Sequence, residues 1–195
     1  HILAFDVQAR AGELQILTAG AGTAHRMPEG QEYLHIVQLA VDSAGLRYQV
    51  LDTAGQIREW LSWPPSLPPA DGWRALPAGE QAAPLPAAPA DDATAARLVA
   101  WRFRGTCPPA GAGDSQTLLC GWNDDGGLAY PWIGLLGAEQ RLGVLLGFAP
   151  GRSPYLWHGP TLAPGEPFDV QVAIHTGMGP GGILWRSGDG APWSS

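Results

Sequence analysis

A proline-rich segment between Trp63 and Asp92 limits what this chain can fold into more than any other feature. Its prolines, in runs such as WPPSLPPADGW and APLPAAPA, are too dense for an α-helix or the interior of a sheet to continue through it. Such a composition is typical of an extended linker with polyproline character. The segment predicts a chain in three parts: residues 1–62, a linker over 63–92, and residues 93–195.

Short alternating apolar runs on both sides of the linker predict β-strands. In PFDVQVAIH every second residue from Phe168 to Ile174 is apolar, and RLVAWRFRG sets Arg102 and Arg104 on the face opposite its aromatic residues. Before the linker, ILAFDVQ, ELQILTAG, EYLHIVQLAVD and LRYQVLD read as four antiparallel strands, while QIREWLSW is a fifth strand or a short helical turn. Together with 27 glycines and 19 prolines, these runs predict an all-β protein, with a short antiparallel strand set followed by a β-sandwich.

Charge excludes several classes of function. The net charge is −7, and every basic residue is arginine because the sequence contains no lysine. A Walker-type phosphate loop and a Schiff-base enzyme both need a lysine, so neither is expected. Nucleic acid is not an expected partner, because no basic stripe is present. No apolar run is long enough to predict a membrane span, and the compartment is not indicated.

The stretch GAGTAHRMPEG, residues 20–30, looks at first like a phosphate or metal loop. A dinucleotide fingerprint needs a third glycine where His25 stands, and the residues that follow do not predict a helix. His25 and His35 are candidate metal ligands on separate elements, but no carboxylate cluster accompanies them. We therefore favour a turn at residues 20–30 and a packed, neutral His35.

Two other short motifs offer weaker candidates. Asn123, Asp124 and Asp125 in NDDGG supply adjacent oxygen donors for calcium, although consecutive carboxylates tend to diverge. Cys107 and Cys120 flank a short loop, where a disulfide and a pair of free thiols are equally compatible with the sequence.

Tryptophan is abundant, with nine residues in the chain. Exposed indoles near strand ends stack on sugar rings, whereas buried ones fill the cores of small sandwiches. A glycan or another small-molecule ligand is therefore a candidate partner. The carboxylate pair of a glycan-cleaving enzyme would be Glu166 with Asp169, or Asp124 with Asp125. The tryptophans that we consider as ligand-binding candidates are Trp122, Trp132, Trp157 and Trp185.

The run from GAGTAHRMPEG through EYLHIVQLAVD to LRYQVLDTAGQIREW resembles the end of the catalytic domain of calcineurin-like metallophosphoesterases. The resemblance implies a parent hydrolase with two divalent metals that generate a hydroxide nucleophile for phosphate-ester cleavage. None of that family's metal-ligand motifs occurs in this chain, so they are expected in a catalytic domain upstream of it. His25, Arg26 and His35 would then line the cleft, and this chain alone would not be catalytic.

Residues 93–195 are similar to concanavalin A-like and laminin-G-like jelly rolls in LGVLLGFAPG, GPTLAPGEPFDVQVAIHTG and GGILWRSG. The resemblance implies an accessory domain of ligand-binding type, and the unit lacks the last strands that a closed jelly roll needs. The leading expectation is therefore a C-terminal phosphoesterase fragment with an accessory sandwich. The alternatives are a non-enzymatic carbohydrate-binding or adhesion module and a glycan-cleaving jelly roll.

Overall fold

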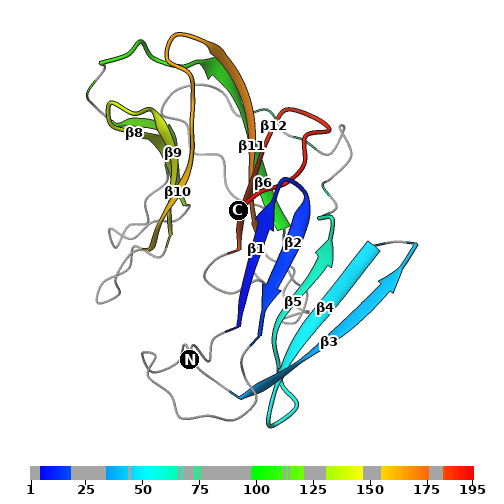
Figure 1. The fold of residues 1–195 in the computed structure, drawn as a ribbon. Helices are drawn as coiled ribbons and strands as arrows, with labels where there is room; N and C mark the ends of the chain where they lie inside the picture. Colours follow the sequence, from blue (N-terminus) through cyan, green and yellow to red (C-terminus); the bar gives the residue numbers. More distant parts are fainter. Residues whose placement is uncertain are drawn as a thin grey trace. The chain divides into compact units, whose positions relative to one another are not determined.

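The computed structural model describes residues 5–18, 34–43, 45–65, 67, 73, 75, 98–111, 113, 115–120, 131–146, 155–175 and 182–195. These residues form twelve strands and no helix, which confirms the predicted all-β class (Figure 1). The strands are β1 Asp6–Arg10, β2 Glu13–Leu17, β3 His35–Asp42, β4 Gly45–Asp52, β5 Ile57–Trp63, β6 Leu98–Thr106, β7 Gln116–Leu119, β8 Trp132–Leu136, β9 Arg141–Leu146, β10 Tyr155–Thr161, β11 Pro167–His175 and β12 Ile183–Ser187.

The strands form four sheets with the orders β1-β2, β3-β4-β5, β12-β11-β6 and β10-β9-β8-β7. Within the first, second and fourth sheets all neighbours are antiparallel. QIREWLSW is a strand, β5, and not a helical turn, because it continues the sheet beside β4. None of the described residues belongs to a helix that could cross a lipid bilayer.

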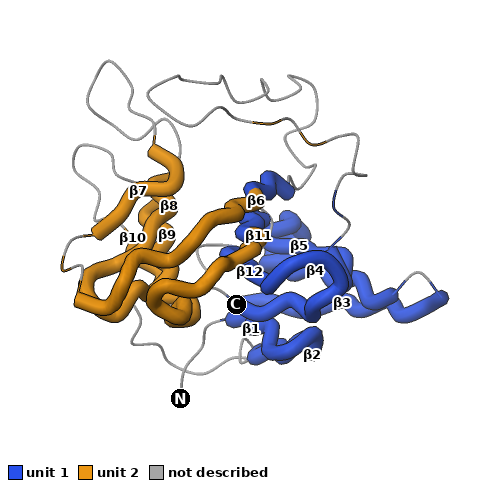
Figure 2. Tube along the Cα trace, turned by 90° about the horizontal axis from the view of Figure 1, so that it is seen from above, with its two compact units in different colours: residues 1–67, 94–101, 172–195 blue, residues 68–93, 102–171 orange. Residues whose placement is uncertain are grey.

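The chain divides into two compact units that are not continuous in sequence (Figure 2). The first contains residues 1–67, 94–101 and 172–195, and the second contains residues 68–93 and 102–171. Strands from before and after the predicted linker share one core in the first unit, and the boundaries 1–62 and 93–195 stay a prediction. That core contains Val7, Ala9, Tyr48, Val50, Leu61, Trp63, Ala173, Leu184 and Trp193.

The chain ends of the first unit are also joined by hydrogen bonds. Gly12 N donates to Trp193 O at 2.8 Å, and Ser195 N donates to Ala9 O at 2.7 Å. Trp63 Nε1 donates to Gly12 O at 3.0 Å, so the end of β5 is held at the turn between β1 and β2. These bonds satisfy polar groups at the rim of the core, where an unpaired group would be costly.

The second unit has its own buried residues, which occupy alternate positions of β8 and β9 and lie opposite one another across the two strands. Ile133, Leu135, Leu142 and Val144 are all at most 1% exposed. Glycines on these strands leave room for large neighbours; a Cβ on Gly143 would collide with the side chain of Leu136. The close approach explains why glycine interrupts the apolar runs.

The β3–β4 hairpin fixes the register of the second sheet. Asp42 pairs with Gly45, and only two residues separate them, as in the tightest hairpins. Gly45 has φ +115°, and a Cβ there would meet the carbonyl oxygen of Trp63. Pairing then continues without a shift to His35 and Asp52, so the side chains of β3 and β4 alternate regularly between the two faces.

Candidate ligand-binding face

Several residues predicted to form sites lie outside the described residues. They are His25 and Arg26 of the cleft-lining set, Asn123, Asp124 and Asp125 of the calcium motif, and Trp122. The described residues contain no group of three or more His, Cys, Asp and Glu that could hold a metal ion.

His35 is packed in the first unit and is not exposed on a cleft. It is 8% exposed, its Nε2 lies 3.0 Å from Thr18 Oγ1, and its ring meets Phe5 edge-on with centroids 5.8 Å apart. It shares a strand face with Val37, which packs against the core. The packed histidine favoured from the sequence is therefore the observed arrangement.

The described candidate tryptophans lie on three separate strands. Trp157 on β10 is 8% exposed, as expected of a tryptophan that fills space in a core. Trp132 on β8 donates from Nε1 to Thr117 Oγ1 at 2.9 Å, and Trp185 on β12 forms an antiparallel bridge with Ser194. They are spread over both compact units, so the structure does not gather them on one strand or one sheet.

Cys107 and Cys120 are not joined by a disulfide in the structure. Cys107 is 1% exposed, and its Sγ lies 3.9 Å from Gln140 Oε1 and 3.9 Å from Leu162 O. Burial raises the pKa of the Cys107 thiol, which keeps it protonated and weakly nucleophilic.

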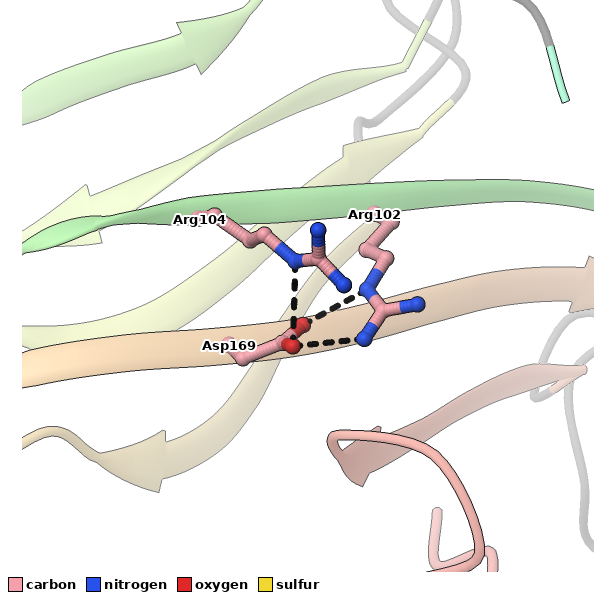
Figure 3. Close-up of polar contacts among 3 residues, drawn as sticks. All are labelled: Arg102, Arg104 and Asp169. Atoms are coloured by element: carbon pink, nitrogen blue, oxygen red, sulfur yellow. Dashed lines mark hydrogen bonds and ion pairs between the residues drawn. The ribbon is translucent and has the colours of Figure 1, made fainter.

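Asp169 is held by two arginines of the neighbouring strand (Figure 3). Arg102 donates from Nε and Nη2 to the two carboxylate oxygens at 2.8 and 2.6 Å, and Arg104 Nε donates at 3.1 Å. The hydrogen bonds from Arg102, followed by those from Arg104, lower the pKa of Asp169. The two arginines therefore favour the ionised form of Asp169 and link β6 to β11.

The described residues do gather polar and aromatic side chains on one face, the outer face of the β3-β4-β5 sheet. The registers set Gln38 opposite Gln49 and Gln49 opposite Trp60, so the three form a row across the strands. This row crosses an open depression with a volume of about 560 Å³, within the size range of small-molecule sites. The depression is lined by Gln38, Leu39, Ala40, Arg47, Tyr48, Gln49, Ile57, Trp60, Leu61 and Ser62.

The two amides in this row bond to each other. Gln49 Nε2 donates to Gln38 Oε1 at 2.5 Å. A primary amide has two N–H donors and one carbonyl oxygen with two lone pairs. The bond uses one N–H of Gln49 and one lone pair of the Gln38 carbonyl oxygen, so each amide keeps further donor and acceptor capacity.

Arg47 is the one ionised residue among the described residues that line the depression, and its charge is balanced locally. Arg47 pairs with Asp42 through Nη1 at 3.5 Å and Nη2 at 2.5 Å, and both side chains are about half exposed. The pair is therefore close to neutral as seen by a ligand on this face. Among the described residues, none that lines the depression is a cysteine, histidine, aspartate or glutamate.

Trp60 supplies the aromatic end of the row. It is partly buried, and its ring meets the His175 ring edge-on with centroids 5.7 Å apart. Burial lowers the pKa of His175, which keeps the imidazole neutral beside the indole. The sequence did not indicate Trp60 because QIREWLSW was compatible with either a strand or a helical turn. In a strand, the side chains of Trp60 and of the buried Leu61 lie on opposite faces of the sheet.

Comparison with protein-family models, with curated proteins and with solved structures finds no match to this chain. The resemblances to metallophosphoesterases and to concanavalin A-like domains therefore stay predictions from the sequence.

Proposed function

We propose that this chain is a non-catalytic carbohydrate-binding module and that its binding surface is the outer face of β3-β4-β5. The row of Gln38, Gln49 and Trp60 across an open depression is the observation that carries the proposal. This is the adhesion or carbohydrate-binding alternative of the sequence analysis, moved to residues that the sequence did not indicate.

The chemistry of the row supports a sugar ligand. A pyranose presents neighbouring hydroxyls, each of which donates and accepts, and the two bonded amides keep both donor and acceptor capacity. The indole of Trp60 offers an aromatic ring, which suits the C–H face of the same sugar. Because Gln38 and Gln49 restrain each other, less side-chain entropy is lost when a ligand binds.

The balanced charge of Arg47 and Asp42 favours neutral glycans over acidic ones. A free arginine on this face would attract sulfated or carboxylated sugars, whereas a paired one adds little long-range attraction. Neutral hexose polymers are therefore the expected class of ligand.

A glycan array probed with the 195-residue chain tests the proposal, followed by calorimetry on the best neutral oligosaccharide. Trp60→Ala should weaken binding about tenfold or more, through lost stacking. Gln49→Leu should weaken it by a similar factor. Trp132→Ala, in the second unit, is the matched control and should bind like the parent.

Binding should be the same with calcium and with a chelator, because none of the described residues that line the depression is acidic. Loss of binding on chelation would instead assign the ligand to the calcium motif at 123–125. Absence of binding to every glycan, or equal losses in Trp60→Ala and Trp132→Ala, would refute the proposed face.

A further inference from the structure

Strand β3 is an open edge with exposed apolar side chains. In the described part of the chain it pairs with β4 on one side and with no strand on the other, and Figure 1 draws it at the outer side of β4. Ile36 is 60% exposed, Leu39 59% and Val41 75%. Soluble proteins seldom leave so apolar an edge strand open, because it can pair with another chain.

The hairpin register shows which backbone groups the edge offers. In antiparallel strands the hydrogen-bonded pairs alternate with the non-bonded ones, and the pair flanking a two-residue turn, Asp42 and Gly45, is bonded. The even-numbered residues of β3 therefore use their N–H and C=O groups on β4. Val37, Leu39 and Val41 direct theirs to the open edge.

The devices that usually block such an edge are missing from β3. Its sequence, HIVQLAVD, has no lysine and no proline, and its pairing with β4 runs from His35 to Asp42 without a bulge. Its one acidic side chain, Asp42, lies at the end and is already paired with Arg47. The open edge is thus both regular and almost uncharged.

We propose that two copies of this chain pair through β3 in an antiparallel, two-fold symmetric arrangement centred on Leu39. Leu39 then lies opposite its own symmetry mate, and Val37 lies opposite Val41 of the second copy. All these residues direct backbone groups to the edge, so the arrangement adds about six backbone hydrogen bonds. This inference rests on β3 alone and does not depend on the proposed carbohydrate ligand.

The side chains of β3 suit a second copy as the occupant of this edge. A two-fold contact requires a strand that is complementary to itself. Here the cross-strand pairs on the face of Val37 are entirely aliphatic, and they cover Leu39 and Val41, the two most exposed residues of that face. The two Asp42 residues are six positions apart along the paired strands, roughly 20 Å, which exceeds the screening length in physiological salt.

The test is the oligomeric state of the chain by sedimentation velocity over a concentration series. The parent chain should form dimers. Leu39→Lys should be monomeric, because two ammonium groups would then oppose each other at the centre of the contact. Leu39→Glu should be monomeric for the same reason, and an equimolar mixture of the two variants should recover dimers.

Recovery in the mixture separates lost pairing from lost folding, and circular dichroism of each variant checks the fold. Leu156→Lys is the matched control: it charges an exposed leucine on another edge strand, β10, and should leave the dimer intact. A parent chain that is monomeric at every concentration overturns the inference. So does a dimer that persists in both Leu39 variants, or a mixture that stays monomeric while both variants are folded.

Discussion

Replacing Leu184 with alanine tests whether the two ends of the chain share one core. Leu184 lies on β12, is 0% exposed, and belongs to the cluster that contains Val7 and Val50. The substitution removes three carbon groups, worth about 2.4 kcal/mol at 0.8 kcal/mol for each. A cavity that does not collapse adds to this, and buried Leu→Ala changes cost about 2–5 kcal/mol. We expect a loss of about 3 kcal/mol.

Native-state hydrogen exchange provides the assay, because it reports on each strand separately. If the first unit opens cooperatively, a loss of about 3 kcal/mol should reduce the protection of β4 amides roughly a hundredfold, although β4 is far from Leu184 in sequence. Leu156→Ala serves as the control, since this leucine is 39% exposed on β10 and should change stability by less than about 0.5 kcal/mol.

The opposite result would be faster exchange in β12 with unchanged exchange in β4. It would mean that residues 172–195 open independently of residues 5–65, as the boundaries expected from the linker imply. The reasoning from a shared core would then be refuted.

Two further substitutions test local geometry. Asp169→Asn should lower the free energy of unfolding by about 1 kcal/mol at pH 7, because its ion pairs with Arg102 and Arg104 are partly exposed. The folded-state pKa of Asp169 is lowered, so this contribution to stability is present above the unfolded-state pKa, near 3.8. It is lost as the pH falls through the folded-state pKa. Urea titrations of parent and variant should therefore converge below that pH. Gly45→Ala should cost roughly 1–3 kcal/mol through its positive φ alone. The collision with Trp63 O adds to that cost, so Gly55→Ala, at φ +75° with open space, should unfold at a higher urea concentration than Gly45→Ala, and the reverse order would contradict the steric argument.

Local patterns in the sequence determined much of the fold class. The alternation in PFDVQVAIH and RLVAWRFRG predicts strands, and the structure has β11 and β6 there. The same alternation correctly sets Arg102 and Arg104 on one face, but it does not indicate that Asp169 is their partner. Side-chain direction along a strand is a local property with a period of two, so it is legible before the neighbours are known.

Only the tertiary structure decided which strands meet. Ala173 and Leu184 share a core with Val7 because distant strands pack together, and no proline-rich boundary could reveal that. The register of β3, β4 and β5 places Trp60 in one row with Gln38 and Gln49. The tryptophans chosen from the sequence are not gathered in such a row. Neighbour choice and register depend on non-local hydrophobic burial and hydrogen bonding, so they are properties of the folded chain and cannot be assigned to any short stretch of its sequence.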